Sequence, residues 1–312
     1  MDYEPSLIIV SNGAKHSIFN ACYAVLEAGD EVIIPAPYWL TYPEVVKVCG
    51  ATPVYIECKK ENKFKFTAEE LRAAITPNTK MLIFNSPSNP TGSVYTEEEV
   101  RAIAKVCEEA EIFVLSDEIY EKLCYNGVKP FSMAACSEKM KDLTITVNGV
   151  SKTYAMTGWR VGYLAAPKDV AKAIDSFQSH ATSNASSISQ YATIEALNSP
   201  EEEIEGMRKV FDARRAKLLS LIDEIDGVSA VEPDGAFYVM LIIGGLYGKK
   251  YGDKTIDGSV AFADALLDSE KVATIPGISF GADDCVRLSY ALSEADIEEG
   301  LARIKRFVES LS

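Results

Sequence analysis

Histidine, positive charge and long apolar runs are all scarce in this chain of 312 residues. The chain has only two histidines, His16 and His180, which lie far apart in the sequence. This composition does not favour a histidine metal site or a Ser-His-Asp triad. No apolar run approaches the roughly 20 residues of a membrane-spanning helix, and the first residues do not form a signal peptide. We therefore expect neither a membrane protein nor one of these histidine-based sites.

The shortage of positive charge limits the possible partners. Lysine and arginine number 31 against 46 aspartates and glutamates, which gives a formal net charge of −15. No dense basic stripe is present to offset phosphate repulsion, so we expect no nucleic-acid partner. The seven cysteines are an odd number without CxxC spacing, which favours reduced thiols in a cytoplasmic protein.

Strand-like and helix-like segments alternate through the first two thirds of the chain. Apolar, β-rich runs occur at 31–35, 53–57, 80–85, 112–116, 143–147 and 161–166. Helical periodicity appears between them, at 15–28, 67–75, 96–110 and 167–179. Such alternation predicts an α/β fold with a mostly parallel central sheet covered by helices on both faces.

The pattern changes after Pro200, where an acidic first turn begins a long helix that we expect to reach about Asp226. The elements expected beyond it are a strand at 235–241, a helix near 259–269, strands near 272 and 286, and a final helix from 294. The Gly- and Lys-rich stretch 244–255 is expected to be an exposed loop. We therefore predict a large domain over residues 1–205 and a smaller α+β domain over 206–312.

Five side chains in ordered motifs supply the chemistry needed to hold and tune pyridoxal phosphate. Lys152, eight residues before Arg160, offers an amine that can form a Schiff base, and the arginine offers a guanidinium that can clamp a phosphate. Asp117 ends an apolar strand and could stabilise a protonated ring nitrogen. Tyr120 and Asn89 could each donate a hydrogen bond to the phenolate oxygen of the ring.

The motifs SNGAK, APYW, NSPSNPTG, SDEIY, SK…MTGWRVGY and VRLSYA occur in that order. Together they resemble the class I aminotransferases of fold type I, most closely the bacterial-type aspartate aminotransferase subgroup, which includes prephenate aminotransferases. The resemblance runs from about residue 5 to the C-terminus. It implies a pyridoxal-phosphate enzyme that acts as a homodimer on an amino acid and a 2-oxo acid.

The resemblance also implies roles for residues that would not stand out alone. Gly13 and Ala14 precede a helix whose N–H groups could meet the phosphate, and Trp39 would stack on the pyridine ring and border the substrate. Arg287 would bind the substrate α-carboxylate as a bidentate partner, with Asn89 nearby. Lys15 stands where the subgroup has a lysine for the distal carboxylate, which favours aspartate and glutamate, with prephenate or arogenate also possible.

Ordinary structural roles compete with these assignments. Without the resemblance, Gly13 and Ala14 form a simple loop before a helix, Trp39 is a core aromatic, Arg287 joins a surface ion pair and Lys15 is an exposed first-turn residue. The segment GAFY at 235–238 is expected to bring Phe237 toward the substrate pocket.

The resulting hypothesis is transamination with ping-pong kinetics. Lys152 holds the cofactor as a Schiff base, is displaced by the amino acid, and then moves the α-proton as general base and acid, while Asp117 keeps the ring nitrogen protonated. One alternative is a pyridoxal-phosphate-dependent β-eliminating lyase that uses the same residues. Another is a truncated cofactor-binding remnant with weak, unselective turnover, since related chains normally begin well upstream of SNGAK.

Overall fold

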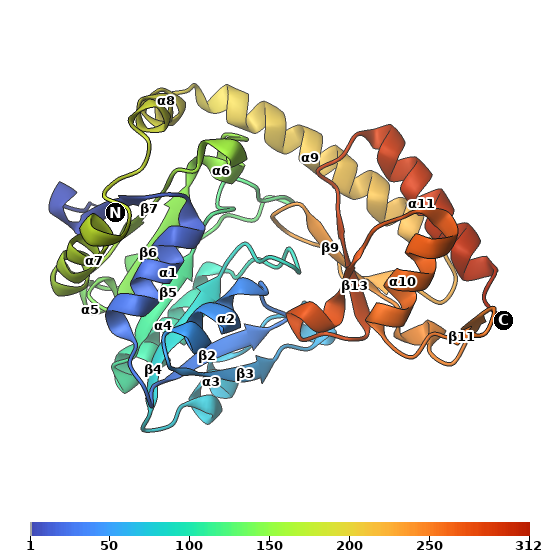
Figure 1. Ribbon diagram of the computed structural model, residues 1–312, viewed down its shortest axis with the longest axis horizontal. Helices are drawn as coiled ribbons and strands as arrows, with labels where there is room; N and C mark the ends of the chain where they lie inside the picture. Colours follow the sequence, from blue (N-terminus) through green and yellow to red (C-terminus); the bar gives the residue numbers. More distant parts are fainter. Residues whose placement is uncertain (1) are drawn as a thin grey trace.

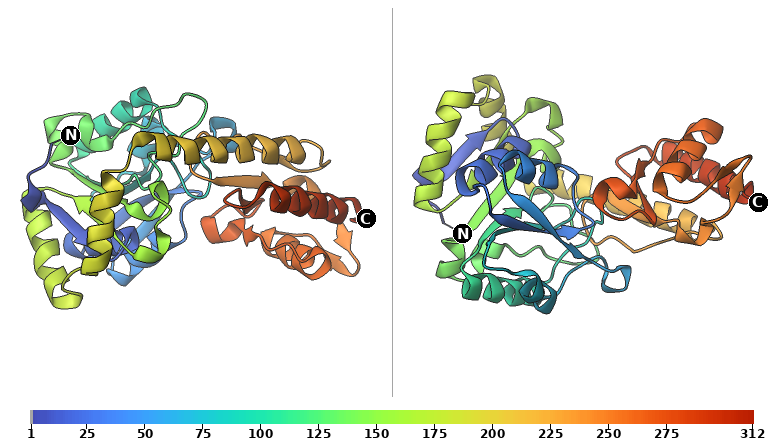
Figure 2. Two further views of the ribbon diagram at one scale, coloured as in Figure 1. Left: turned by 90° about the horizontal axis from the view of Figure 1, so that it is seen from above. Right: turned by 60° about the horizontal axis from the view of Figure 1, so that its bottom comes forward.

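Two lobes joined by a long helix make up the computed structural model, which describes residues 2–312 (Figures 1 and 2). The N-terminal lobe contains a seven-stranded sheet of order β1-β7-β6-β5-β4-β2-β3. Its strands are β1 (Ile8–Ser11), β2 (Glu31–Ala36), β3 (Thr52–Glu57), β4 (Thr79–Asn85), β5 (Phe113–Asp117), β6 (Thr144–Gly149) and β7 (Gly162–Ala165).

The central strands of this sheet run parallel. The pairs β2–β3, β2–β4, β4–β5 and β5–β6 are parallel, whereas β7 is antiparallel to both β6 and β1. Asn85 and Asp117, the last residues of β4 and β5, are register partners. Because the carboxyl ends of parallel strands share one edge of a sheet, residues that follow these strands gather there. The predicted mostly parallel α/β fold is confirmed.

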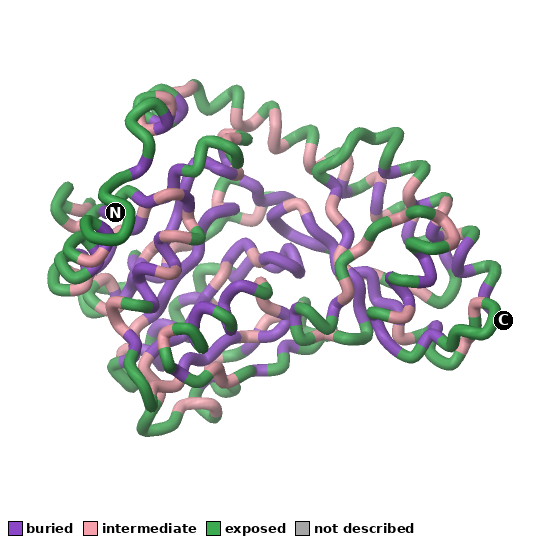
Figure 3. Tube along the Cα trace, in the orientation of Figure 1, coloured by how far each residue is buried: buried purple, intermediate pink, exposed green. Residues whose placement is uncertain are grey.

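Helices cover both faces of the sheet, which explains why its strands are continuous apolar runs. Val32 and Ile34 of β2 join a core beneath one set of helices, and Ile33 joins a second core on the other face. The first set comprises α1 (Ala14–Val25), α2 (Thr41–Val48) and α7 (Lys168–Ala181), and the second comprises α3 (Ala68–Ala74), α4 (Glu97–Ala110) and α5 (Glu138–Lys141). Figure 3 shows the buried strands among more exposed helices.

The C-terminal lobe is a smaller α+β unit with its own core. Its four-stranded antiparallel sheet has the order β12-β13-β9-β8. The strands are β8 (Ser229–Ala230), β9 (Tyr238–Ile242), β12 (Ile275–Pro276) and β13 (Cys285–Ser289); the helices are α9 (Glu201–Ile222), α10 (Ser259–Glu270) and α11 (Glu294–Glu309). In Figure 2, α9 runs from the larger lobe along the smaller one. The domain boundary predicted at 205/206 lies within α9 and stays a prediction.

Several differences from the predicted elements lie in this second lobe. The strand expected near 272 lies three residues later, as β12, and β9 begins at Tyr238 rather than at 235, just beyond Ala236, which has a positive φ of 57°. The expected exposed loop 244–255 contains the buried Leu246 and a hairpin of β10 (Lys250–Tyr251) and β11 (Lys254–Thr255). Two-residue strands are too short to display an alternating pattern.

Further elements were not predicted from the sequence. They include β1, α2, α5, α8 (Ser187–Leu197) and the short helix α6 (Val150–Thr153) and, in the second lobe, β8. Across the part of the chain that the structure describes, no helix combines the length and the apolar character required to cross a membrane.

Candidate active site

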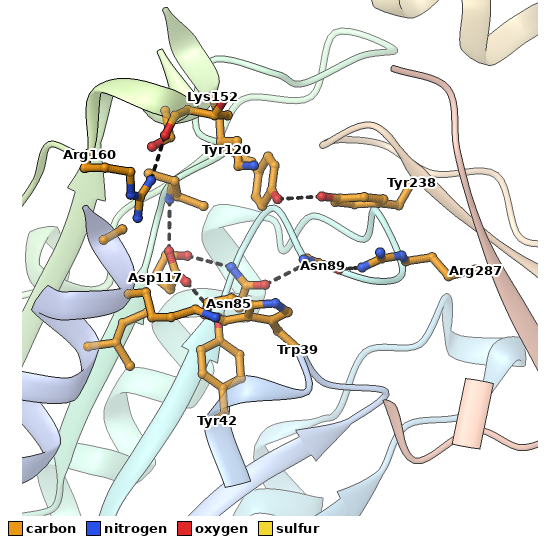
Figure 4. A pocket seen from close by; sticks show the side chains of 16 residues that line it. Trp39, Tyr42, Asn85, Asn89, Asp117, Tyr120, Lys152, Arg160, Tyr238 and Arg287 are labelled. Atoms are coloured by element: carbon orange, nitrogen blue, oxygen red, sulfur yellow. Dashed lines mark hydrogen bonds between the residues drawn. The ribbon is translucent and has the colours of Figure 1, made fainter. Parts of the chain in front are cut away.

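A cavity of about 280 Å³ lies at the carboxyl edge of the large sheet, facing the second lobe (Figure 4). Nine of the ten predicted site residues line it, and the tenth, Gly13, directly precedes the lining residue Ala14. The full lining is Ala14, Lys15, Ile18, Trp39, Tyr42, Asn85, Asn89, Asp117, Ile119, Tyr120, Ser151, Lys152, Thr157, Arg160, Tyr238 and Arg287.

The cavity is strongly cationic in a chain that is acidic overall. Lys15, Lys152, Arg160 and Arg287 line it, with Asp117 as the single carboxylate among the lining residues. The chain as a whole carries a formal charge of −15. A concentration of positive charge in a concave site attracts anionic ligands.

Asp117 is a buried carboxylate held by two neutral donors. Its Oδ2 accepts a hydrogen bond from the Tyr42 hydroxyl at 2.7 Å, and its Oδ1 accepts one from the Ile119 backbone N–H at 3.2 Å. Burial raises the pKa of Asp117 to about 6, while these donors and the nearby Lys152 ammonium act in the opposite direction. The carboxylate can therefore stabilise a positive charge brought into the cavity.

Lys152 lies in the short helix α6 (Val150–Thr153), three residues beyond the end of β6. Its pKa is lowered by burial, then by the positive charges of Arg160 and Arg287, and Asp117 opposes this change. The rings of Tyr120 and Phe237 lie 5.8 and 5.4 Å from its Nζ. A lowered pKa leaves more of the amine neutral and able to act as a nucleophile or base.

Arg160 and the start of α1 form one end of the cavity. The Arg160 Nη1 donates to the Thr157 carbonyl at 2.8 Å. A Cβ on Gly13 would lie 2.3 Å from Arg160 Nη2, and one on Gly162 would lie 2.2 Å from the Ala14 nitrogen. Glycine at 13 therefore lets the guanidinium approach the helix N-terminus, where backbone N–H groups lack intrahelical partners, and glycine at 162 lets β7 lie against the same helix start. The combination suits an anion such as a phosphate.

Arg287 reaches the opposite end of the cavity from β13 of the second lobe. Its Nη1 donates to Asn89 Oδ1 at 2.8 Å, and its guanidinium lies 4.5 Å from the ring centre of Tyr238 and 4.9 Å from that of Phe280. The contact partners are an amide and two aromatic faces rather than the carboxylate of a surface ion pair. The planar guanidinium is thus held where it could bind a carboxylate.

Asn85 connects the strand end that carries Asp117 with the Arg287 end of the site. Its Nδ2 donates to the Asp117 carbonyl at 2.9 Å, and its Oδ1 accepts from the Asn89 N–H at 2.8 Å. The chain of contacts therefore runs from the strand end that carries Asp117 to the turn that carries Asn89, and on to Arg287 (Figure 4).

Lys15 and Trp39 lie together in the cavity wall. The Lys15 Nζ is 4.8 Å from the centre of the Trp39 ring, and the lysine is solvent-exposed. The Trp39 ring meets Tyr42 edge-on, with ring centres 5.3 Å apart and planes at 85°. Lys15 is thus both an exposed first-turn residue and a cavity residue.

Sequence reasoning missed three lining residues whose side chains contact the predicted ones. Tyr42 lies three residues after Trp39, Asn85 opens the NSPSNPTG motif, and Tyr238 ends the GAFY segment. The Tyr238 hydroxyl is 3.1 Å from that of Tyr120. The only available signals were these positions within or beside the motifs.

Comparison with known proteins agrees with this arrangement. The family model described as "Aminotransferase class I and II" matches residues 1–304. An "Aspartate aminotransferase" of Bacillus subtilis (strain 168) is 49% identical over 312 residues, covering 100% of this chain and 78% of the relative. An "Aspartate/prephenate aminotransferase" of Cereibacter sphaeroides is 44% identical over 314 residues, with the same coverages of 100% and 78%.

Solved structures show the same likeness in three dimensions. The aspartate aminotransferase from Rhizobium meliloti superposes with a TM-score of 0.97 at 42% identity, covering 100% of this chain and 78% of that one. The family model, the sequence relatives and the fold coincide over nearly all of the chain. The chain therefore belongs to the class I and II aminotransferases.

Proposed function

We propose that this chain is a pyridoxal-phosphate-dependent aminotransferase that exchanges an amino group between an acidic amino acid, aspartate or glutamate first, and a 2-oxo acid. The observation that carries the proposal is the position of Lys152 beside Asp117, in a cavity with a cationic group at each end. Family membership and the names of the relatives support the reaction class. Prephenate or arogenate remains a second substrate pair within the same chemistry.

The residues of the cavity fit pyridoxal phosphate at its phosphate end. The close approach that Gly13 permits brings the Arg160 guanidinium to the N-terminus of α1, beside Ala14. A phosphate there would meet both a charged fork and unpaired backbone N–H groups. Ser151 and Thr157, which also line this region, offer hydroxyl groups.

The remaining groups fit the ring of the cofactor. When bound, pyridoxal phosphate supplies an aldehyde that condenses with amines and a ring that withdraws electrons from the substrate α-carbon. Asp117 would hold the ring nitrogen in its protonated form, and Trp39 would face the ring. Tyr120 and Asn89 would donate hydrogen bonds to the ring's phenolate oxygen.

Lys152 would carry the proton transfers. Its lowered pKa provides a neutral amine that can accept the α-proton of the substrate and return it elsewhere. The rings of Tyr120 and Phe237 beside its Nζ help to exclude water from that amine.

Two cations would select a substrate with two carboxylates. Arg287 would bind the α-carboxylate, since its guanidinium is fixed by Asn89 and Tyr238. Lys15 would pair with the distal carboxylate from the wall beside Trp39. An amino acid with a single carboxylate would use only the first of these cations, which favours aspartate and glutamate.

A spectroscopic titration tests the proposal. The purified protein, loaded with pyridoxal phosphate, should show the absorbance of a Schiff base, and borohydride reduction followed by peptide mapping should place the adduct on Lys152. Adding aspartate should remove the band with release of oxaloacetate, and adding 2-oxoglutarate should restore it. Release of pyruvate and ammonia would instead identify an eliminating lyase. A band that is unchanged by any amino acid would contradict the proposal.

We also propose a homodimer formed mainly through the larger lobe. The helix α8 exposes Ile188 and Tyr191 at 75% and 77%, and Ile194 and Leu197 lie exposed further along it. Large apolar side chains gathered on one short helix favour contact with another protein surface. Light scattering should therefore give twice the chain mass of 34.0 kDa, and a monomer mass would contradict this arrangement.

A further inference from the structure

Tyr42 touches two groups that would face the ring of the cofactor. It is buried, with an exposed fraction of 2%, and lies in α2 three residues after Trp39. Its hydroxyl donates to Asp117 Oδ2 at 2.7 Å, and its ring packs edge-on against Trp39 (Figure 4). One side chain is thus in contact both with the carboxylate and with the indole.

We propose that Tyr42 is a positioning residue, which directs the Asp117 carboxylate into the cavity through its hydroxyl and fixes the plane of Trp39 through its ring. The inference rests on the proposed function for the identity of the ring that these two groups meet. It assigns no contact between Tyr42 itself and the reacting atoms.

The hydroxyl is important because Asp117 is buried and accepts its hydrogen bonds from neutral donors. The bond from Tyr42 is 2.7 Å long and the bond from the Ile119 N–H is 3.2 Å long, so the phenol is the closer donor. Burial favours the neutral acid, and each donor favours the carboxylate. Removing the hydroxyl therefore raises the pKa of Asp117 further. It also leaves Oδ2 without this donor, so that the carboxylate can turn more freely.

Other titratable groups surround this pair from neighbouring elements. Lys152 approaches from α6 and favours the charged carboxylate, Tyr120 follows Asp117 by three residues, and the Cys22 thiol of α1 adjoins Tyr42. Glu118 points elsewhere, because its Oε1 accepts from the hydroxyls of Ser116 and Ser132. These groups are unchanged when only the Tyr42 hydroxyl is removed, so its effect can be isolated.

The ring of Tyr42 has a separate task. Its edge-on contact with Trp39, at 5.3 Å, restricts the indole to one orientation. Tyr42→Phe keeps this contact and removes only the hydroxyl, whereas Tyr42→Leu removes both. The two variants therefore separate the two parts of the proposal.

Tyr95→Phe provides a matched control. The Tyr95 hydroxyl is also buried, but it accepts a hydrogen bond from the Phe66 backbone N–H, away from the cavity lining. This variant reports the general consequence of deleting a buried phenol hydroxyl. A purely structural role for Tyr42 predicts that Tyr42→Phe and Tyr95→Phe behave alike.

The first measurement uses the apoprotein and is independent of activity. Carbon-13 NMR of aspartate-labelled protein, with the Asp117 signal assigned by its loss in Asp117→Asn, follows ionisation of this carboxyl group. We expect Tyr42→Phe to raise its pKa by about one unit, a tenfold change in its ionisation equilibrium, and Tyr95→Phe to leave it unchanged. Equal pKa values in wild type and Tyr42→Phe would overturn the assignment of the hydroxyl.

Fluorescence tests the ring. Trp39 and Trp159 are the two tryptophans of the sequence, so a Trp159→Phe background leaves Trp39 as the single reporter. The Trp39 emission should keep its wild-type maximum in Tyr42→Phe and shift in Tyr42→Leu. An unshifted maximum in Tyr42→Leu would overturn the role of the ring.

The last measurement uses the protein loaded with pyridoxal phosphate. In single turnovers with aspartate, Tyr42→Phe should slow α-proton transfer about tenfold while KM changes less than twofold, because the carboxylate is less able to keep the ring nitrogen protonated. A wild-type protein without turnover would contradict the proposed function, and the two apoprotein measurements would still decide the role of Tyr42. A loss shared equally by Tyr95→Phe would overturn the inference.

Discussion

The two ends of the cavity are built in different ways. Asp117 and Lys152 are placed by the carboxyl edge of one sheet, on β5 and just beyond β6. Arg287 comes from the other lobe and meets Asn89 across 198 residues of sequence. The end with Asp117 and Lys152 depends on one sheet, whereas the end with Arg287 depends on how two lobes meet. We call them the cofactor end and the substrate end, because changes at the former should alter cofactor chemistry and changes at the latter should alter substrate binding.

The junction of the lobes passes through the turn that carries Asn89. The Gly92 carbonyl accepts hydrogen bonds from the N–H groups of Asp234 and Gly235, at 3.0 and 2.8 Å. Gly92 has φ of 71°, and a Cβ there would lie 2.3 Å from the Pro233 Cβ. Glycine is thus required where the second lobe lies against the turn. The NPTG motif therefore supplies both the side chain that holds Arg287 and the backbone contact between the lobes.

The largest effect should come from removing the amine at the cofactor end. Lys152→Ala should abolish the borohydride-reducible adduct and lower transamination on the order of 10⁴-fold or more, because nucleophile and general base are lost together. Stopped-flow absorbance with aspartate measures this. Lys168→Ala, an exposed lysine of α7, is the control and should be unchanged. A reducible adduct in Lys152→Ala would place the Schiff base on another residue.

A smaller and different loss is expected at the substrate end. Arg287→Ala should raise KM for every amino acid about 100-fold, or roughly 3 kcal/mol, because the proposed charge-assisted, bidentate partner of the α-carboxylate would be removed. Cofactor affinity, measured by equilibrium absorbance, should change little. Arg287→Lys should be intermediate, since it keeps the charge and loses the planar fork. Loss of cofactor with unchanged KM would reverse the assignment of the two ends.

The sequence predicted the central strands of the first lobe well because strands that are buried on both faces are continuous apolar runs. The strands β2 and β4 are apolar on both faces, and the Thr96 capping box marks the start of α4. The second lobe has strands as short as β12, the Ile275–Pro276 pair, which leave no periodic signal. Buried Leu246 lies in a Gly- and Lys-rich stretch whose local composition indicates a loop.

The candidate site likewise contains residues that could be predicted from the sequence and contacts that could not. Asp117 and Lys152 could be placed in one cavity from the sequence because the carboxyl ends of parallel strands share an edge of the sheet. The Tyr42–Asp117 hydrogen bond joins residues 75 apart, and the Tyr120–Tyr238 contact joins residues 118 apart. Such pairs depend on the packing of α2 and of the second lobe, which no local pattern encodes. The roles of individual residues stay predictions.

The packing between lobes can be weakened without touching the cavity. Arg215 of α9 is buried and donates to Asp212, Glu232 and the Asn126 amide, at 2.8, 2.6 and 2.9 Å. Arg215→Met should lower the free energy of unfolding by roughly 2–3 kcal/mol, because the positive charge and the N–H groups that bind these three partners are lost. KM should rise a few-fold with cofactor affinity unchanged, as the second lobe loosens. Arg303→Met, which breaks a more exposed i,i+4 pair with Glu299, should cost about 0.5 kcal/mol or less.

The smallest effect should be one of selectivity, at Lys15. Because this lysine is exposed and only its charge would reach the distal carboxylate in the proposed role, Lys15→Ala should raise KM for aspartate about tenfold, near 1.4 kcal/mol, and leave KM for alanine within twofold. Lys15→Arg keeps both the charge and a cation over the Trp39 ring, so it should retain most of the preference. Steady-state kinetics with both amino acids measures the difference. Equal losses for aspartate and alanine would place Lys15 in support of Trp39 or the phosphate rather than in substrate choice.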